Sequence, residues 1–160
     1  MRAEETRDFK LIYEIMSCDA IYPYITEDGS PDCLDYEPPD TPAMRYVMIY
    51  DDDGSELGLF VLVTQNMAMA EVHTCLLPRA YGSKAVKAGK LMEKWVWDAT
   101  KFHRLVTLVP AYNRVALAFA KRCGMVQYGL NPKSYMKKGV LWDSILLGLS
   151  RPEETGPKCQ

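Results

Sequence analysis

The chain has 160 residues, of which 48% are hydrophobic and 25% are charged. This composition is typical of one globular domain that folds without disulfides or metals. Its net charge of −2 is unevenly distributed. Residues 1–60 carry 4 basic and 15 acidic side chains, whereas residues 61–160 carry 15 basic and 6 acidic side chains. The net −11 of the first part argues against a nucleic-acid-binding protein, and the net +9 of the second suits an anionic ligand.

Other classes of protein are excluded by local features. The first ten residues have no apolar run, which predicts no secretory signal. The longest uncharged stretch, residues 57–70, has 14 residues and is too short and too polar to span a membrane. The 5 cysteines are odd in number and form no CxxC motif, which argues against a metal cluster or a disulfide framework. These features predict a cytoplasmic protein with reduced thiols.

The first part of the chain begins with apolar residues at helical spacing, which predicts an amphipathic helix over residues 7–18. A loop rich in Pro, Asp, Gly and Tyr follows over residues 22–42, and a loop of this length is usually functional or a binding lid. Apolar alternation and short turns then predict three antiparallel strands. They cover residues 45–50, 57–65 and 69–77.

The second part alternates helices and strands. An apolar stripe predicts a helix within residues 79–102, and a second helix begins after Asn113 and ends at Gly124, which are good N-cap and C-cap residues. Short strands are predicted over residues 104–110, 125–130 and 141–149. The fold class is therefore α+β, with a mixed, mostly antiparallel central sheet and flanking helices. We expect a single domain over residues 1–151 and a flexible tail over residues 152–160.

The segment most informative about chemistry is the strand, glycine-containing turn and basic helix of residues 69–90. Backbone N–H groups in such a turn and at the start of a helix form an anion-binding site. Arg79, Lys84, Lys87 and Lys90 add positive charge, which favours a polyanion such as a pyrophosphate. Taken alone, a glycine before a basic helix is more often only a turn.

The order and spacing of the motifs resemble the GNAT acetyltransferase superfamily. The family's acetyl-CoA motif, [Arg/Gln]-x-x-Gly-x-[Gly/Ala], here reads Arg79-Ala80-Tyr81-Gly82-Ser83-Lys84, with Lys84 where a small residue is usual. Asn113, Ala116, Gly124 and Gly129 are similar to a second family pattern, and residues 139–151 are similar to the branch that acetylates N-terminal amines of ribosomal proteins. Small GNAT-like proteins of tailed phages are also similar. The resemblance implies a GNAT-like acyl-CoA N-acyltransferase fold over roughly residues 43–151.

The resemblance also implies acetyl-CoA as the cofactor. Backbone N–H groups of residues 79–85 would hold its pyrophosphate, supplemented by the charges of Arg79 and Lys84. The pantetheine arm would lie in a wedge where the strand ending at Leu76–Leu77 diverges from the strand of residues 105–109. The implied cofactor-binding residues are Leu76, Leu77, Arg79, Ala80, Tyr81, Gly82, Ser83, Lys84, Ala85 and Asn113.

Acetyl transfer needs a base, because an amine with a pKa of roughly 10.4 is mostly protonated at neutral pH. Glu71 stands where some family members keep a catalytic glutamate, and His73, two residues on, points to the same face of the strand. Either could be the base; otherwise Glu71 is a solvated carboxylate and His73 a packed histidine. Ala120 stands where many members carry a tyrosine that protonates the departing CoA thiolate. Here another group would protonate the thiolate, or the thiolate would leave unassisted.

Two functions follow from these residues. The first is an acetyl-CoA-dependent N-acetyltransferase that acts on a primary amine of a protein N-terminus, a lysine or a small molecule, with Glu71, His73 and Asn113 as catalytic residues. The alternative is a catalytically weak or inactive GNAT-like phage protein that acts in a virion, in assembly or on a host protein, as the Lys84 and Ala120 departures favour.

The acidic segment of residues 27–40 steers a cationic amine or is simply solvated. Neither function requires a metal, a nucleic acid or a membrane.

Overall fold

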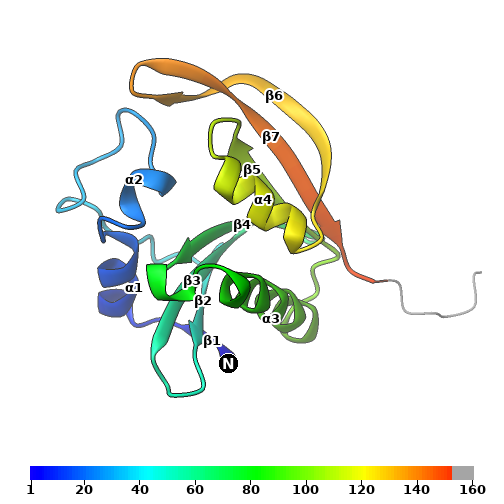
Figure 1. Ribbon diagram of the computed structural model, residues 1–160. Coiled ribbons are helices and arrows are strands. Elements are labelled where there is room, and N and C mark those ends of the chain that lie inside the picture. Colours follow the sequence, from blue (N-terminus) through cyan, green and yellow to red (C-terminus); the bar gives the residue numbers. More distant parts are fainter. Residues whose placement is uncertain (153–160) are drawn as a thin grey trace, which may run out of the picture.

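The computed structural model describes residues 1–152, which form a seven-stranded mixed sheet with helices on both faces (Figure 1). Its strand order is β1-β2-β3-β4-β5-β7-β6, and all neighbours are antiparallel except β4 and β5. The division into a domain over residues 1–151 and a tail stays a prediction, because residues 153–160 lie outside the described part. The strands are β1 (Arg2–Thr6), β2 (Met44–Tyr50), β3 (Glu56–Thr64), β4 (Met69–Leu76), β5 (Arg104–Pro110), β6 (Val126–Lys137) and β7 (Val140–Ser150).

The helices follow from the sequence patterns. Asn113 caps the last of them, since its side chain accepts a hydrogen bond from the Ala116 N–H at 3.1 Å, and Gly124 ends it with a φ of +94°. The helices are α1 (Phe9–Met16), α2 (Tyr22–Ile25), α3 (Ser83–Ala99) and α4 (Arg114–Arg122), and the short 3-10 helix η1 (Pro78–Ala80) precedes α3. No helix in residues 1–152 is long and apolar enough to cross a membrane.

Two hydrophobic cores lie on opposite faces of the sheet, because alternate residues of a strand point to opposite sides. On one face, α3 and α4 pack on side chains such as Phe60 and Leu105. On the other face, α1 packs on a cluster that includes Met48, Leu59 and Cys75. The alternation in β2 and β3 therefore determines which helix each side chain meets.

The predicted element order was wrong in one respect, because it began with a helix and omitted β1. This strand lies at the edge of the sheet and pairs with β2 over residues 2–6. Three of its five residues are charged, so it lacks the apolar alternation that indicates a strand. Charged side chains are common on edge strands, and Glu5 pairs with Arg45 of β2 at 3.3 Å. Only the pairing with β2 makes this segment extended.

The C-terminal hairpin also extends further than its sequence pattern indicated. β6 continues from the predicted end at Leu130 to Lys137, and its register with β7 shifts between Asn131 and Tyr135. The turn consists of Lys138 and Gly139, with φ values of +54° and +72°. Positive φ at both residues is the geometry of a two-residue type I′ hairpin turn.

Candidate functional site

The central feature of the site is the divergence of β4 and β5. These parallel strands pair at three positions, from Met69 with Arg104 to Glu71 with Val106, and then separate. Beyond these pairs, Val72, His73, Thr74 and Leu76 of β4 and Thr107–Pro110 of β5 line a cleft of about 1090 Å³. The divergence frees backbone donors and acceptors on both strand edges, which an extended ligand can bind as an added strand would.

Side chains of β4 divide between the two openings of the cleft. Glu71 and His73 share a face with Cys75, which packs in the core beneath α1. Val72 and Leu76 point the other way, into the core beneath α3. We call the α1 side of the cleft the acceptor side and the α3 side the cofactor side, after the two ligands that the sequence resemblance predicts.

The start of α3 lies at the cofactor side. Gly82 is the N-cap residue with φ +77° and ψ −134°, and residues 1–152 provide no side-chain hydrogen bond to cap the helix. The N–H groups of the first helical turn lack intrahelical partners, and the helix dipole makes this end positive. Tyr81, Gly82 and Ala85 line the cleft here. The local geometry is therefore that of an anion-binding turn.

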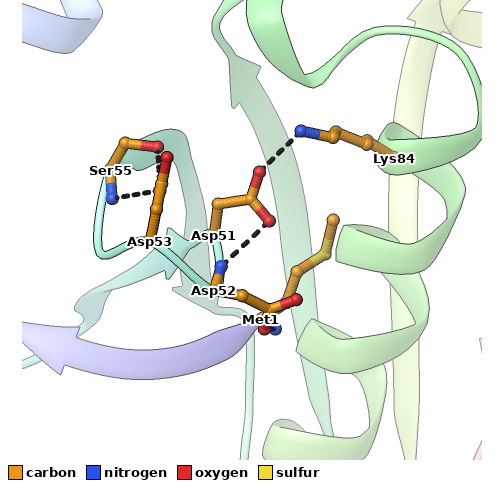
Figure 2. A network of polar contacts seen from close by, with 6 residues as sticks. All are labelled: Met1, Asp51, Asp52, Asp53, Ser55 and Lys84. Carbon is orange, nitrogen blue, oxygen red and sulfur yellow. Dashed lines mark hydrogen bonds and ion pairs between the residues drawn. The ribbon is translucent and has the colours of Figure 1, made fainter.

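Lys84 does not direct its charge into the cleft. Its ammonium donates a hydrogen bond to Asp51 at 2.6 Å, which ties α3 to the turn between β2 and β3 (Figure 2). Lys84 and Lys87 border a separate pocket that includes Asp51 and Leu91. Arg79 pairs with Glu56 at 3.6 Å, and Lys90 pairs with Glu93 at 2.9 Å. Three of the four cations thus face carboxylates, and none of the four lines the cleft.

Basic side chains that do line the cleft come from α4. Arg114 and Arg122 stand among its lining residues, together with Asn113. The Oδ1 atom of Asn113 is occupied as the cap of α4, which leaves its amide group as the donor toward a ligand. Sequence reasoning missed the two arginines, because an arginine at each end of an amphipathic helix is the ordinary pattern of a solvated face.

The Asp51–Lys84 ion pair predicts a pH-dependent stability. The hydrogen bond from the Lys84 ammonium, with a second from the Asp52 N–H, holds the pKa of the Asp51 carboxyl below its ordinary value of 3.8. A lowered pKa contributes stability above the ordinary value that is lost as the pH falls through the folded-state value. We expect Asp51→Asn to lower the melting temperature at about pH 7, and this difference from the wild type to shrink as the pH falls below 3.8. Asp35→Asn, an exposed carboxylate on the loop after α2, is the control, and equal melting temperatures of Asp51→Asn and wild type at neutral pH would contradict the ion pair's role.

Glu71 and His73 meet on the acceptor side, as their spacing predicts. The Nε2 atom of His73 lies 3.4 Å from Oε1 of Glu71, and Gln65 donates a hydrogen bond to Oε2 at 3.2 Å. The His73 side chain is 45% exposed and that of Glu71 is 20% exposed. When Nε2 carries the proton and faces Glu71, Nδ1 is left as a proton acceptor.

The cysteines of the cleft region are not nucleophiles. Burial raises the pKa of the Cys75 thiol to about 12 and that of Cys123 to about 11. Both thiols are therefore protonated at neutral pH, when only a thiolate is reactive. A Cys75–His73 pair, which their shared strand face allows, is thus unsuited to covalent catalysis. Ala120 is buried and lines the cleft, so α4 supplies no hydroxyl at this position.

Hydroxyl groups enter the acceptor side from the C-terminal hairpin. Ser144, the one buried polar residue in the described part of the chain, has its Oγ 2.8 Å from that of Ser134, and both line the cleft. Tyr135 lines it too, and burial raises the pKa of this phenol well above its usual range. Sequence reasoning missed Ser134 and Tyr135 because it ended the strand at Leu130, and it placed Ser144 on a strand without any signal that this residue borders a cleft.

The acidic segment of residues 27–40 contributes its charges mainly to structure. The Asp28 carboxylate binds the turn of the β6–β7 hairpin, and Asp40 pairs with Arg7 at 2.7 Å. The acidic residues that line the cleft are Asp19, Glu71 and Glu93. No group of three or more His, Cys, Asp or Glu side chains within residues 1–152 is suited to hold a metal ion.

Comparison with known proteins gives matches among solved structures. No protein-family model matches the sequence, and no curated protein does. A mutant spermidine N-acetyltransferase from Vibrio cholerae superposes with a TM-score of 0.73 at 15% identity, covering 94% of this chain and 95% of that one. The Vibrio cholerae enzyme in complex with CoA and spermine gives a TM-score of 0.74 at 18% identity, covering 93% of each chain. The likeness shows that this chain has the GNAT acyl-CoA N-acyltransferase fold; its predicted likeness to the ribosomal-protein and phage branches stays a prediction.

Proposed function

We propose that the protein is an acetyl-CoA-dependent N-acetyltransferase whose acceptor is a small-molecule primary amine. The observation that carries the proposal is the divergence of β4 and β5 after three residue pairs, which opens a cleft through the sheet. A structurally similar protein is described in complex with CoA and spermine, which supports both ligand classes. Acetylation of a protein N-terminus or a lysine remains an alternative that the assay below tests.

The cofactor side has the features that a CoA thioester requires. The open space beside Gly82, where a Cβ atom would meet nothing of the described residues within 4 Å, lets a phosphate approach the backbone. The N–H groups of residues 83–85 would hold the pyrophosphate, and the unpaired edges of β4 and β5 would bind the pantetheine amides. Acetyl-CoA supplies the activated acyl group when bound.

On the acceptor side, His73 would remove the proton from the amine as the nitrogen attacks the thioester carbonyl. The Glu71 carboxylate, 3.4 Å from Nε2 of His73, would orient the ring, and a hydrogen bond from Gln65 in turn holds Glu71. Asp19 and Glu71 give this side a negative charge that favours a cationic amine. With Ala120 in place of a tyrosine, the thiolate, with a pKa of roughly 8.5, would leave without a proton from α4.

Calorimetry and turnover test the proposal together. We expect acetyl-CoA to bind with a dissociation constant on the order of micromolar, and CoA release to be observed with spermidine. A peptide with a free N-terminus and a lysine-containing peptide with a blocked N-terminus serve as the alternative acceptors. Absence of acetyl-CoA binding would contradict the proposal, and binding without turnover of any amine would favour the alternative of a fold kept without catalysis.

A further inference from the structure

Two segments 110 residues apart in the chain meet in the fold, namely the loop after α2 and the tip of the β6–β7 hairpin (Figure 1). The N–H groups of the turn residues Lys138 and Gly139 point away from the β6–β7 ladder, because the flanking pair is Lys137 with Val140. Oδ1 of Asp28 accepts from the Lys138 N–H at 2.9 Å, and Oδ2 accepts from the Gly139 N–H at 2.7 Å. One carboxylate thus satisfies both backbone donors of the turn.

A second set of contacts joins the same two segments. The Lys137 ammonium donates to the carbonyl oxygen of Pro23 at 2.7 Å and to that of Thr26. The Asp28 N–H also donates to the Met136 carbonyl at 3.0 Å. We call the side chains of Asp28 and Lys137, with the backbone groups they bind, the latch.

Residues beside the latch on both segments line the cleft. Tyr24 and Ile25 line it from α2, and Ser134 and Tyr135 line it from β6. α2 has four residues, too few for an isolated helix to be stable. Its position therefore depends on contacts to other segments, and the latch supplies charge-assisted hydrogen bonds immediately beside it.

We propose that Asp28 and Lys137 are positioning residues for the amine acceptor, because they fasten the α2 loop to the hairpin and so assemble the acceptor side before the amine arrives. This inference rests on the proposed function. A chain without the latch presents the assembled walls in only a fraction of molecules, which raises the apparent KM for the amine by the inverse of that fraction. Acetyl-CoA would bind at α3 and at the edges of β4 and β5, so its dissociation constant is independent of the latch.

The test uses two matched pairs of variants in the full chain. Asp28→Asn is compared with Glu27→Gln, the neighbouring exposed carboxylate, and Lys137→Met with Lys138→Met, which loses the same charge but keeps the turn N–H. We expect the two latch variants to raise the KM for spermidine about three- to thirtyfold, with kcat and the acetyl-CoA dissociation constant unchanged. Lys137→Arg, which keeps the positive charge and the hydrogen-bond donors, should have the wild-type KM for spermidine.

Amide hydrogen exchange without ligands provides a readout that does not depend on activity. The N–H groups of Lys138 and Gly139 should exchange slowly in the wild type and in Glu27→Gln, and several-fold faster in Asp28→Asn. Unchanged exchange in Asp28→Asn would overturn the latch as a structural element. If both latch variants turn over spermidine with the wild-type KM, only the latch's role toward the acceptor is overturned, and the proposed function stands. If the wild-type chain acetylates no amine, that role and the proposed function are both overturned.

Discussion

Replacing His73 with alanine is expected to lower kcat for amine acetylation by about 10²- to 10⁴-fold, the usual contribution of a positioned general base. The ring stands on the acceptor side of the cleft with Nε2 directed at Glu71, so no other nitrogen of β4 replaces its Nδ1 atom. The dissociation constant of acetyl-CoA should be unchanged, because His73 points to the opposite side of the sheet from α3. Steady-state kinetics with spermidine and calorimetry with acetyl-CoA measure the two quantities.

Glu71→Gln separates the two roles that sequence alone left open. If His73 is the base and Glu71 orients it, the glutamine keeps a hydrogen-bond acceptor and kcat falls less than in His73→Ala. A larger fall in Glu71→Gln would instead assign the base to Glu71. His103→Ala is the matched control, since this histidine is exposed in the segment just before β5. Full activity of both His73→Ala and Glu71→Gln would show that neither residue takes up the proton.

Replacing Gly82 with valine is expected to weaken acetyl-CoA binding by about 5- to 150-fold, which corresponds to about 1–3 kcal/mol of backbone strain. The reason is conformational and not steric, because a Cβ at this position has open space but φ is +77° with ψ −134°. A branched residue would leave this region and turn the N–H groups at the start of α3 away from the bound phosphates. Calorimetry with acetyl-CoA measures the effect.

Gly54→Val provides the matched control for this prediction. Gly54 also has a positive φ, +86°, with nothing of the described residues within 4 Å of a Cβ, but it lies in the turn between β2 and β3. Both variants should lose folding stability by similar amounts, and only Gly82→Val should lose affinity for acetyl-CoA. Equal affinities for the two variants would mean that the start of α3 does not bind the cofactor.

Much of the fold could be predicted because local patterns and tertiary packing agree. The apolar stripe of α3, the alternation in β2 and β3, and the cap of Asn113 each specify their elements within a few residues. The shared face of Glu71 and His73 was predictable as well, since side chains two apart in a strand always point the same way. These features depend on residues close together in sequence.

Contacts between distant residues decided the rest. The charged segment Arg2–Thr6 is a strand because the edge of β2 offers it unpaired backbone groups, and nothing in its own composition requires this. The sequence position of Lys84 suggested that it binds a phosphate, but its ammonium is hydrogen-bonded to Asp51, 33 residues away.

The charge division along the chain shows the same distinction. Sequence alone determined that acidic residues gather in residues 1–60 and basic residues in the remainder. Tertiary structure decided which of these charges meet: within residues 1–152, Asp51 pairs with Lys84 and Glu56 with Arg79 across the two parts, and Asp28 binds the hairpin turn. The physical reason is that ion pairs form between side chains that folding brings within a few ångströms, a separation that sequence distance does not encode.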